Sequence, residues 1–458
     1  MFSKNVYVRR RQQLQKQIAS GVILFLGNQE SPMNYPANTY HFRQDSTFLY
    51  FFGLSFPGLA ALIDIDENRQ TLFGNDLDME DIIWTGPQPS LKSRCQKIGI
   101  TDTQPLARLG EALRNVLRQG RRVHFLPPYR SENAICLENL LGICAEKAKS
   151  HASIELIKAV VAQRSLKNGD EIKEIEAALA VTATMYRGAM SLARPGLFER
   201  DIAGMIEGIA LAGGGRLAFP AIVTVHGETL HNHYHGNRMK KGDLLLIDAG
   251  AESEAGYASD ITRTLPVSGT FTSRQREIYE TVLDMQLTAI AAIRPGVTYR
   301  SVHLKACEVL VERLKDLRLM KGDTGEAVAA GAHALFFPHG LGHMMGLDVH
   351  DMEDLGENYV GYDDRSARSQ QFGLAYLRLA RKLQPGFVLT VEPGIYFIPE
   401  LIGQWRADKK HASFIQYSEV NKYRDFGGVR IEDDVVVTRG GARVLGVPIP
   451  KRVAELTS

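Results

Sequence analysis

The stretch KKGDLLLIDAG (residues 240–250) decides the fold, because it recurs in outline as LQPGFVLTVEPG (residues 383–394). In both stretches a glycine precedes an apolar run, an acid stands six residues after that glycine, and another glycine follows two residues later. The acids are Asp248 and Glu392. Short apolar runs bounded by glycines predict buried strands. The two stretches therefore predict two similar strands that each deliver a carboxylate from one end.

A second pair of similar segments lies ahead of each of these strands. GAMSLARPGLFERDIAGMIEGIAL (188–211) resembles TAIAAIRPGVTYRSVHLKACEVLVERL (288–314), and in each a helix ends at Arg-Pro-Gly before a second amphipathic helix. One such match is a common coincidence among glycine-rich turns, but two in the same order are not. We therefore expect two similar α/β halves in one pseudo-symmetric domain, with a site between the halves.

The first part of the chain shows little recognisable chemistry and predicts a compact α/β domain. Apolar runs predict strands at 22–27, 60–66 and 123–127, and helices are expected at 9–19 and 107–120. The character changes at LKNGDEIKEIEAALA, where Asn168 or Asp170 is suited to cap a long helix. We therefore expect a smaller domain over residues 1–165 and the pseudo-symmetric domain over residues 166–458.

Composition and charge exclude several classes of function. The 458 residues carry 54 basic and 52 acidic side chains, and a net charge of +2 gives no reason to expect nucleic acid or a membrane surface as a partner. The Arg9–Arg11 run stands alone and is interpreted as a solvated helix face. No apolar segment is long enough for a signal peptide or a membrane span. The four cysteines form no CxxC pair, so reduced thiols in a cytoplasmic protein are expected.

Four carboxylates lie on strongly apolar strands of the larger domain. Besides Asp248 and Glu392 they are Asp260, which begins the strand returning from Asp248, and Glu432 in GGVRIEDDVVVT. An isolated buried carboxylate is costly unless it is paired or binds a metal. Salt bridges are the structural alternative, but Arg430 is the main basic residue within these strands. The acids therefore indicate a cation site.

The segment FFPHGLGHMMGLDVHD adds His339, His343 and His350. The spacing of the first two is that of a helical zinc motif, but the glutamate beside the first histidine is missing and the intervening glycines weaken a helix. One histidine as a metal ligand and another as an acid–base group fits better.

Three further histidines alternate in LHNHYHGN and would share one face of a strand: His231, His233 and His235. They could form a zinc site of their own, but no nearby acid completes the usual pattern. His231 is therefore interpreted as a group on the substrate side.

The ligand set is rich in oxygen and too large for one catalytic metal with an open position. Such a set suits two divalent ions that share bridging carboxylates, with Mn²⁺ favoured and Co²⁺, Fe²⁺ or Zn²⁺ tolerated. A pair of this kind activates water and stabilises a tetrahedral oxyanion, so hydrolysis is the predicted reaction class.

These residues stand in motifs that resemble a known family. IDAG, ASDITRT, HGLGH, GLDVHD, TVEPGIY and GGVRIEDDVVVT resemble the motifs of the "pita-bread" metallopeptidases of family M24, and within it the proline-specific branch of prolidase and aminopeptidase P. FRQDSTFLYFFGLSFPG (42–58) is similar to the N-terminal domain of that branch. The stretch between Asp248 and Asp260 has one residue more than the usual pattern, and we expect it in the hairpin turn within AESEAGY.

The resemblance implies a role for each matching residue. It implies a ligand set in which Asp248 binds one metal, Asp260 and Glu432 bridge both, and His343 and Glu392 bind the other. Glu392 would also shuttle a proton, while His350 and His231 would steady the substrate and the tetrahedral intermediate. His339 would lie near the proline side, and Arg430 would orient the ligands from behind.

Two features favour an Xaa-Pro dipeptidase over an Xaa-Pro aminopeptidase. The connection between Glu392 and Glu432 is long, as in prolidases, and Arg378 stands where prolidases keep an arginine for the carboxylate of the terminal proline. An ordinary arginine on a helix surface is the structural alternative for Arg378. Trp84 matches a prolidase tryptophan that reaches the neighbouring subunit's site, which implies a homodimer; a buried core tryptophan is its alternative.

Other uses of the fold fit the sequence less well. Non-catalytic pita-bread binding modules and creatinase-like enzymes lack the acidic ligands, which are all present here. The large first domain argues against a methionine aminopeptidase. Hydrolysis of organophosphates as a side activity is compatible with the site but is not indicated by any residue.

Overall fold

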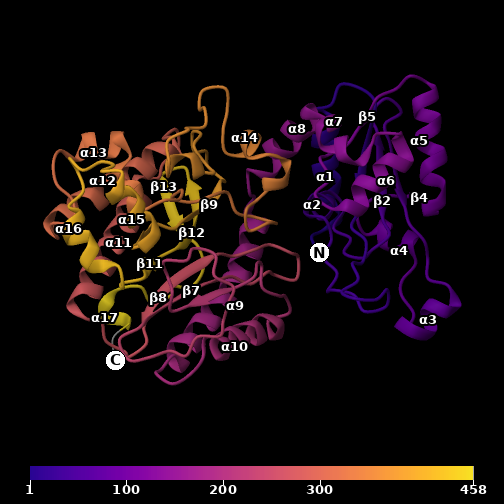
Figure 1. The fold of residues 1–458 in the computed structure, drawn as a ribbon. Helices are drawn as coiled ribbons and strands as arrows, with labels where there is room; N and C mark the ends of the chain where they lie inside the picture. The colour runs from indigo at the N-terminus through magenta and orange to yellow at the C-terminus, as the bar shows by residue number, and fades with distance from the viewer. Residues whose placement is uncertain (457–458) are drawn as a thin grey trace. The chain divides into compact units, whose positions relative to one another are not determined.

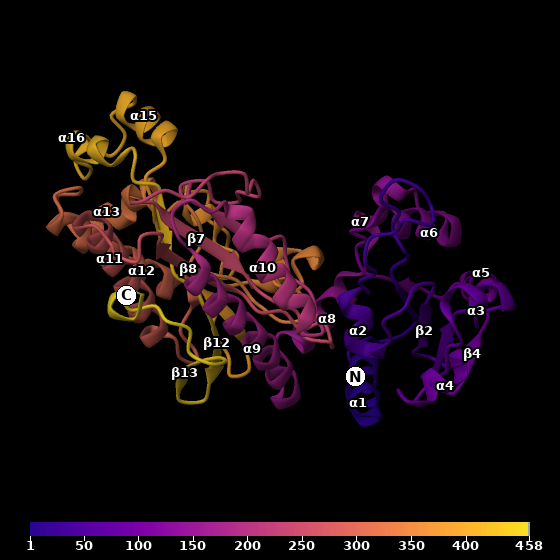
Figure 2. The ribbon, with the colours of Figure 1, turned by 90° about the horizontal axis from the view of Figure 1, so that it is seen from below.

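The computed structural model describes residues 1–456, drawn in Figures 1 and 2. Contacts between Cα atoms divide the chain into two compact units. The first comprises Met1–Arg164 with the short segment Met352–Tyr359, and the second comprises Ser165–Asp351 with the chain from Val360 on. No pattern in the sequence predicted that the segment from Met352 would group with the first unit.

The first unit is built on a five-stranded mixed sheet. Its strands, in the order β4-β3-β2-β1-β5, are Asp102–Gln104, Arg69–Phe73, Ala60–Asp64, Val22–Leu26 and Val123–His124. Its helices are α1 Lys4–Gln15, α2 Ser46–Phe52, α3 Met79–Thr85, α4 Leu91–Gln96, α5 Leu109–Arg118, α6 Ser131–Leu141, α7 Ala148–His151 and α8 Ile154–Arg164. One face of the sheet packs against α5 and α6 through Leu24, Leu62, Leu113 and Leu137. The three strands expected in this part are confirmed, although β5 is shorter than its apolar run.

The interpretation of the basic run near the N-terminus is wrong. Arg10 and Arg11 on α1 are buried rather than solvated. Arg11 donates to the carbonyl oxygens of Phe51 and Ile98 at 2.8 and 2.6 Å and to the Gln70 side chain. Its guanidinium therefore satisfies buried carbonyl groups inside the unit, because its five N–H donors can reach several acceptors at once.

The second unit consists of two similar halves. The first half contains α9 Gly169–Leu192, α10 Glu199–Ala212 and a sheet of β6 Ile222–Thr224, β7 Leu244–Ala249 and β8 Ile261–Pro266. The second contains α11 Ser273–Ala292, α12 Tyr299–Asp316 and a sheet of β9 Val388–Val391, β12 Asp433–Thr438 and β13 Gly441–Val444. Its other elements include α13 Thr324–Ala330, η3 Ala332–Leu335, β10 Gly394–Tyr396, α15 Pro399–Ala407, α16 Tyr417–Val420, β11 Gly428–Arg430 and α17 Val453–Leu456. The short helix α14 Glu357–Val360 crosses the boundary between the two units, since all of it but Val360 belongs to the first.

Equivalent backbone hydrogen bonds join the turn within each helix pair to the segment before the following strand. At the first Arg-Pro-Gly turn, Gly196 N–H donates to Met239 at 2.9 Å and Met239 N–H donates to Leu197 at 2.8 Å. At the second turn, Gly296 N–H donates to Leu383 at 2.9 Å and Leu383 N–H donates back to Val297 at 2.8 Å. These matching bonds confirm the expected pseudo-symmetry, and Figure 2 shows α9 and α10 beside β7 and β8.

Local signals explain where the long helices begin. The Asn168 side chain accepts from the N–H groups of Asp170 and Glu171, and Glu171 bonds back to the Asn168 N–H, which forms a capping box for α9. Asn168 is therefore the cap, rather than Asp170. Thr272 and Gln275 form the same box at α11. Each box fixes the start of the helix that supports one half.

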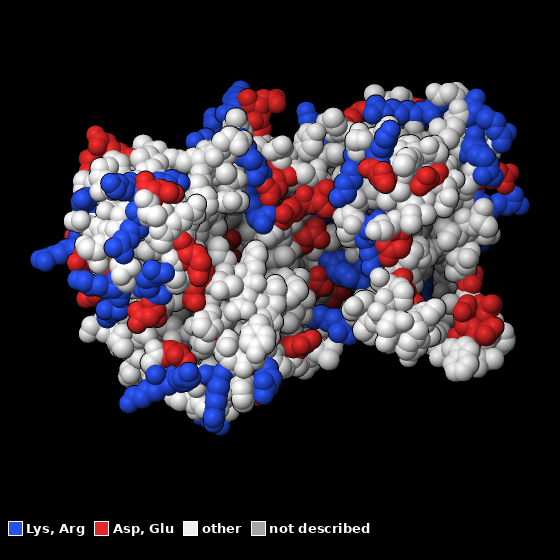
Figure 3. Space-filling model, viewed as in Figure 1, with Lys and Arg blue, Asp and Glu red and all other residues white. Residues whose placement is uncertain are grey.

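Surface and cysteine chemistry agree with an ordinary globular chain. On the face drawn in Figure 3, basic and acidic side chains are interspersed on both units. All four cysteines are unpaired. Within residues 1–456, no helix is both long and apolar enough to cross a bilayer.

Candidate active site

A cavity of about 770 Å³ in the second unit gathers the acids and histidines that the sequence singled out. It is lined by four acids, four histidines and two arginines that the sequence singled out: Asp248, Asp260, Glu392, Glu432, His231, His339, His343, His350, Arg378 and Arg430. Apolar side chains that include Phe219, Leu230, Phe372 and Ile398 form the rest of its wall. Trp84 belongs to the first unit, where it is 80% exposed on α3, so its interpretation as a core residue is wrong.

Strand ends position the four carboxylates. Asp248 lies near the end of β7 and pairs in register with Thr262 of β8, while Asp260 stands just before β8. The chain turns between them at Ser253–Tyr257, within AESEAGY. Glu392 directly follows β9, and Glu432 directly precedes β12. Each half therefore brings acids to the cavity from two neighbouring strand ends.

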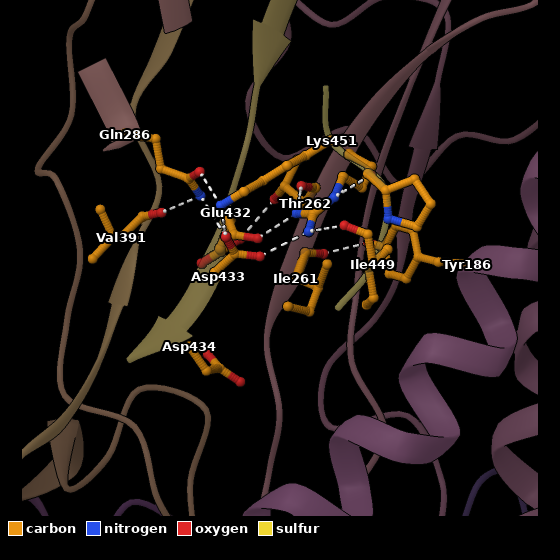
Figure 4. Close-up of polar contacts among 12 residues, drawn as sticks. Tyr186, Ile261, Thr262, Gln286, Val391, Glu432, Asp433, Asp434, Ile449 and Lys451 are labelled. Carbon is orange, nitrogen blue, oxygen red and sulfur yellow. Dashed lines mark hydrogen bonds and ion pairs between the residues drawn. The ribbon is translucent and has the colours of Figure 1, made fainter. Parts of the chain in front are cut away.

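Two backbone contacts tie the halves together at this point. The Glu432 N–H donates to the carbonyl of Thr262 at 3.0 Å, and the Asp260 N–H donates to Oδ2 of Asp434 at 3.0 Å. Asp434, labelled with Thr262 and Glu432 in Figure 4, is fully buried and was not singled out by the sequence. Its side chain holds the Asp260 backbone in place.

The His343 imidazole faces the acids. Its Nε2 lies 3.5 Å from Oδ2 of Asp260 and 3.6 Å from Oε1 of Glu392. Its Nδ1 is 3.0 Å from the carbonyl of Met344, which can only accept, so Nδ1 carries the proton and Nε2 offers its lone pair. The segment that carries His343 pairs with β9, since Thr390 N–H donates to the His343 carbonyl at 3.0 Å. Residues 339–343 form no helix, which agrees with the rejection of the helical zinc motif.

Three of the acids have a buried oxygen without a hydrogen-bond partner: Asp248 Oδ1, Asp260 Oδ1 and Glu432 Oε1. Ligand atoms of Asp260, His343 and Glu432 lie within 4.8 Å of one another. Buried polar atoms are normally satisfied, and a bound cation would supply the partner that these three oxygens lack. The residues present therefore fit a hard divalent cation site.

The pKa values of these side chains reflect their burial and the closeness of several acids. Burial raises the pKa of Asp260 and of Glu432 well above the ordinary range, and the charges of the neighbouring carboxylates raise both further. Burial also raises the pKa of Glu392 to about 7. Burial lowers the pKa of His343 well below its usual value, so this imidazole is neutral. A bound cation would offset this repulsion and favour the ionised acids, and the neutral imidazole can ligate the cation directly.

Arg430 links the acids to the histidine on the far side of the cavity. Its Nη2 donates to Asp248 Oδ2 at 2.6 Å, and its Nη1 donates to the Tyr396 hydroxyl at 2.9 Å. That hydroxyl lies 2.8 Å from Nε2 of His339, whose Nδ1 faces the Gly340 carbonyl at 2.8 Å. Tyr396 therefore accepts from Arg430 and donates to His339. Tyr396 was missed in the sequence; its place four residues after Glu392 was the available signal.

His350 and Arg378 both lie outside helices. The ring centroid of His350 is 4.1 Å from that of His343. A fully buried ion pair between Lys167 and the adjacent Asp351, at 2.8 Å, anchors the segment that carries His350. Arg378 lines the cavity, so its interpretation as a helix-surface arginine is wrong. His231 and His233 line the cavity, whereas His235 faces the carbonyl of Ala221, and they form no three-histidine cluster.

Comparisons with known proteins agree with this geometry. Residues 173–439 match Metallopeptidase family M24, and residues 7–124 match the Aminopeptidase P, N-terminal domain. Human Xaa-Pro dipeptidase is 33% identical over 96% of this chain and 88% of its own length. A probable Xaa-Pro aminopeptidase of Fusarium vanettenii is 34% identical over 91% of this chain and 87% of its own.

Solved structures give the same result. Pseudomonas aeruginosa aminopeptidase PepP superposes with a TM-score of 0.81 at 31% identity, covering 99% of this chain and 97% of that one. Zinc-substituted Escherichia coli aminopeptidase P in complex with product reaches 0.82 at 31% identity and the same coverage. The chain therefore belongs to metallopeptidase family M24, a family of hydrolases, and carries an N-terminal domain of the aminopeptidase P type.

Proposed function

We propose that this protein is a two-metal peptidase that hydrolyses the bond on the amino side of proline and prefers Xaa-Pro dipeptides. The single observation that carries the proposal is the convergence of four buried or partly buried carboxylates and His343 on one cavity, with three carboxylate oxygens left without a partner. The Xaa-Pro peptidases among its relatives support the substrate class.

Five residues would hold two divalent ions, with Asp248 on one ion, Asp260 and Glu432 bridging, and His343 and Glu392 on the other. The oxygen-rich donor set favours Mn²⁺. When bound, two such ions act as Lewis acids toward the peptide carbonyl and activate water for attack. The short contact from Arg430 to Asp248 would hold that carboxylate in a fixed orientation.

The remaining groups would act on the substrate. The side chain of Glu392 is more exposed to the cavity than those of two neighbouring acids. It is 19% exposed, against 7% for Asp260 and 13% for Asp248. It is therefore placed to pass a proton to the proline nitrogen as that nitrogen leaves. His350 and His231 would donate to the developing oxyanion. His339 and the apolar wall would receive the proline ring.

Arg378 would bind the carboxylate of the terminal proline through its planar fork. A longer peptide has no charge at that point, so the dipeptide should bind better. Release of the N-terminal residue from longer Xaa-Pro peptides is the alternative, and the likeness to two solved aminopeptidase P structures favours it.

A comparison of Ala-Pro with Ala-Pro-Ala-amide in Mn²⁺ tests both proposals. We expect faster hydrolysis of the dipeptide, and Arg378→Ala should raise its KM by about 10-fold to 100-fold, the worth of one charge-assisted contact. Exposed Arg365 provides a control, since Arg365→Ala should leave the KM for both substrates unchanged. Preference for the longer peptide would move the enzyme to the aminopeptidases, and no cleavage of either would reject Xaa-Pro hydrolysis.

A homodimer in the cytoplasm completes the proposal. Trp84, Ile83 and Met79 on α3 are 80%, 73% and 70% exposed, and α3 has no buried residue, so this helix offers an apolar face to a second copy. Trp84 would reach the site of that copy. Four unpaired cysteines fit a reducing compartment.

A further inference from the structure

A second cluster of metal-ligating side chains lies in the same unit, away from the carboxylates. His303 and Cys307 stand one turn apart on the same face of α12, and His333 faces them from η3. His303 and Cys307 are fully buried, and His333 is 1% exposed. One ligand atom from each residue lies within 4.8 Å of the other two. No residue of this cluster lines the active-site cavity.

The geometry matches ligands around one ion. Cys307 Sγ lies 3.5 Å from His303 Nε2. Metal–sulfur and metal–nitrogen bonds of about 2.3 and 2.0 Å at a tetrahedral angle separate sulfur and nitrogen by about 3.5 Å. A thiol–imidazole hydrogen bond also fits this single distance, so the histidine nitrogens decide between the two explanations.

Neither ring nitrogen of His333 has a hydrogen-bond partner, and Nδ1 of His303 has none either. A neutral imidazole carries one N–H donor and one acceptor, and buried groups of this kind are normally satisfied. A core built only for packing would use apolar side chains here, as neighbouring Phe337 does, with its ring 5.3 Å from that of His303. Ligation of an ion would provide a partner for one of the two ring nitrogens of His333.

We propose that His303, Cys307 and His333 form a buried structural site for a soft or borderline d¹⁰ ion, Zn²⁺ or Cu⁺, separate from the carboxylate centre. Thiolate with two imidazoles is the donor set that such ions prefer. Binding replaces the thiol proton of Cys307, which leaves to solvent, by a sulfur–metal bond, and no electron is transferred.

The site would fasten α12 to the segment that enters the active site. Phe337 lies between the cluster and the cavity, 5.3 Å from His303 on one side and 4.8 Å from His339 on the other, measured between ring centroids. The bound ion would therefore hold η3 and the residues after it against α12. This is a positioning role and includes no contact with substrate.

Cobalt distinguishes this site from the carboxylate centre, because only a thiolate ligand gives a sulfur-to-Co²⁺ charge-transfer band in the near ultraviolet. We expect this band in protein produced in cells supplied with Co²⁺, since a fully buried site must fill during folding. Cys307→Ser should abolish the band and lower the cobalt content by one ion per chain. Cys95→Ser, at another fully buried free cysteine, should retain both.

Two further variants keep the test decisive. Asp260→Asn should lose cobalt from the carboxylate centre and keep the sulfur band. His333→Leu, which replaces an unpartnered polar ring by an apolar side chain, should lose the band even if Cys307→Ser fails to fold. Zinc and copper analysis of protein from unsupplemented cells then identifies the natural ion. Two results together would overturn the proposal. The cobalt-grown wild type would show no sulfur band, and wild type from unsupplemented cells would contain no more zinc or copper than His333→Leu does.

Discussion

Asp260 combines burial, a backbone contact to the opposite half and one oxygen without a partner. We expect Asp260→Asn to lower activity on Ala-Pro by more than about 100-fold, beyond the usual effect of changes outside a ligand set, and to remove bound Mn²⁺. In chelator the same variant should unfold at a higher temperature than the wild type. The reason is that the raised pKa of Asp260 makes its charge unfavourable to the metal-free fold at neutral pH.

Activity and metal content measured together with thermal unfolding check this prediction. Asp425→Asn, at a side chain that is 87% exposed, is the matched control and should leave all three unchanged. Wild-type turnover in Asp260→Asn would contradict the two-metal proposal.

Asp64 gives a pH dependence at the residue scale. Burial alone would raise its pKa, but hydrogen bonds and charge from Arg121 hold that pKa below its ordinary value. An acid with a lowered folded-state pKa stabilises the fold above its unfolded pKa of about 4 and loses this contribution as pH falls further. Urea unfolding should therefore show Asp64→Asn less stable than the wild type at pH 7, with a smaller difference near pH 3. A difference that grows on acidification would contradict this assignment.

Among the elements, the segment from Leu341 to Met345 depends on a close approach to β9. A Cβ at Gly342 would lie 2.1 Å from the carbonyl oxygen of Thr390, which can move only with the strand. Gly342→Ala should displace His343 and reduce both Mn²⁺ affinity and kcat. Gly208→Ala in α10 meets no atom within 4 Å and should instead stabilise the protein by about 0.5–1 kcal/mol. Mn²⁺ titration and urea unfolding of the pair check both outcomes, and unaltered metal binding in Gly342→Ala would count against the contact.

The elements also show which signals are local. Strands β7 and β9 and the cap at Asn168 follow from apolar runs, glycines and capping chemistry within a few residues. The burial of Arg11 could not be predicted in that way, because its acceptors lie 40 and 87 residues away in sequence. The ion pair of Lys167 with Asp351 spans 184 residues. The acids were predictable because few partners other than a cation suit a carboxylate on an apolar strand, whereas the choice of His343 needed the resemblance.

At the scale of the whole molecule, the apolar face of α3 should control association. Light scattering should report a dimer at micromolar concentration, and Trp84→Ala should shift it toward monomer or raise the KM for Ala-Pro. Ile135→Ala on α6, at a residue that is 54% exposed, is the control and should do neither. A monomeric wild type with unchanged kinetics in Trp84→Ala would reject the assembly.

The matching bonds at the two Arg-Pro-Gly turns have a consequence for the centre they support. An approximate internal twofold relates Asp248 to Glu392, yet the two acids differ by a methylene group, and Asp248 pairs with Arg430 whereas Glu392 faces the His343 imidazole at 3.6 Å. The internal symmetry is therefore broken at the side chains that would bind the two ions. Two ions held by such unequal partners would be distinguishable, so one would leave at lower chelator strength and the other would remain as the last to exchange.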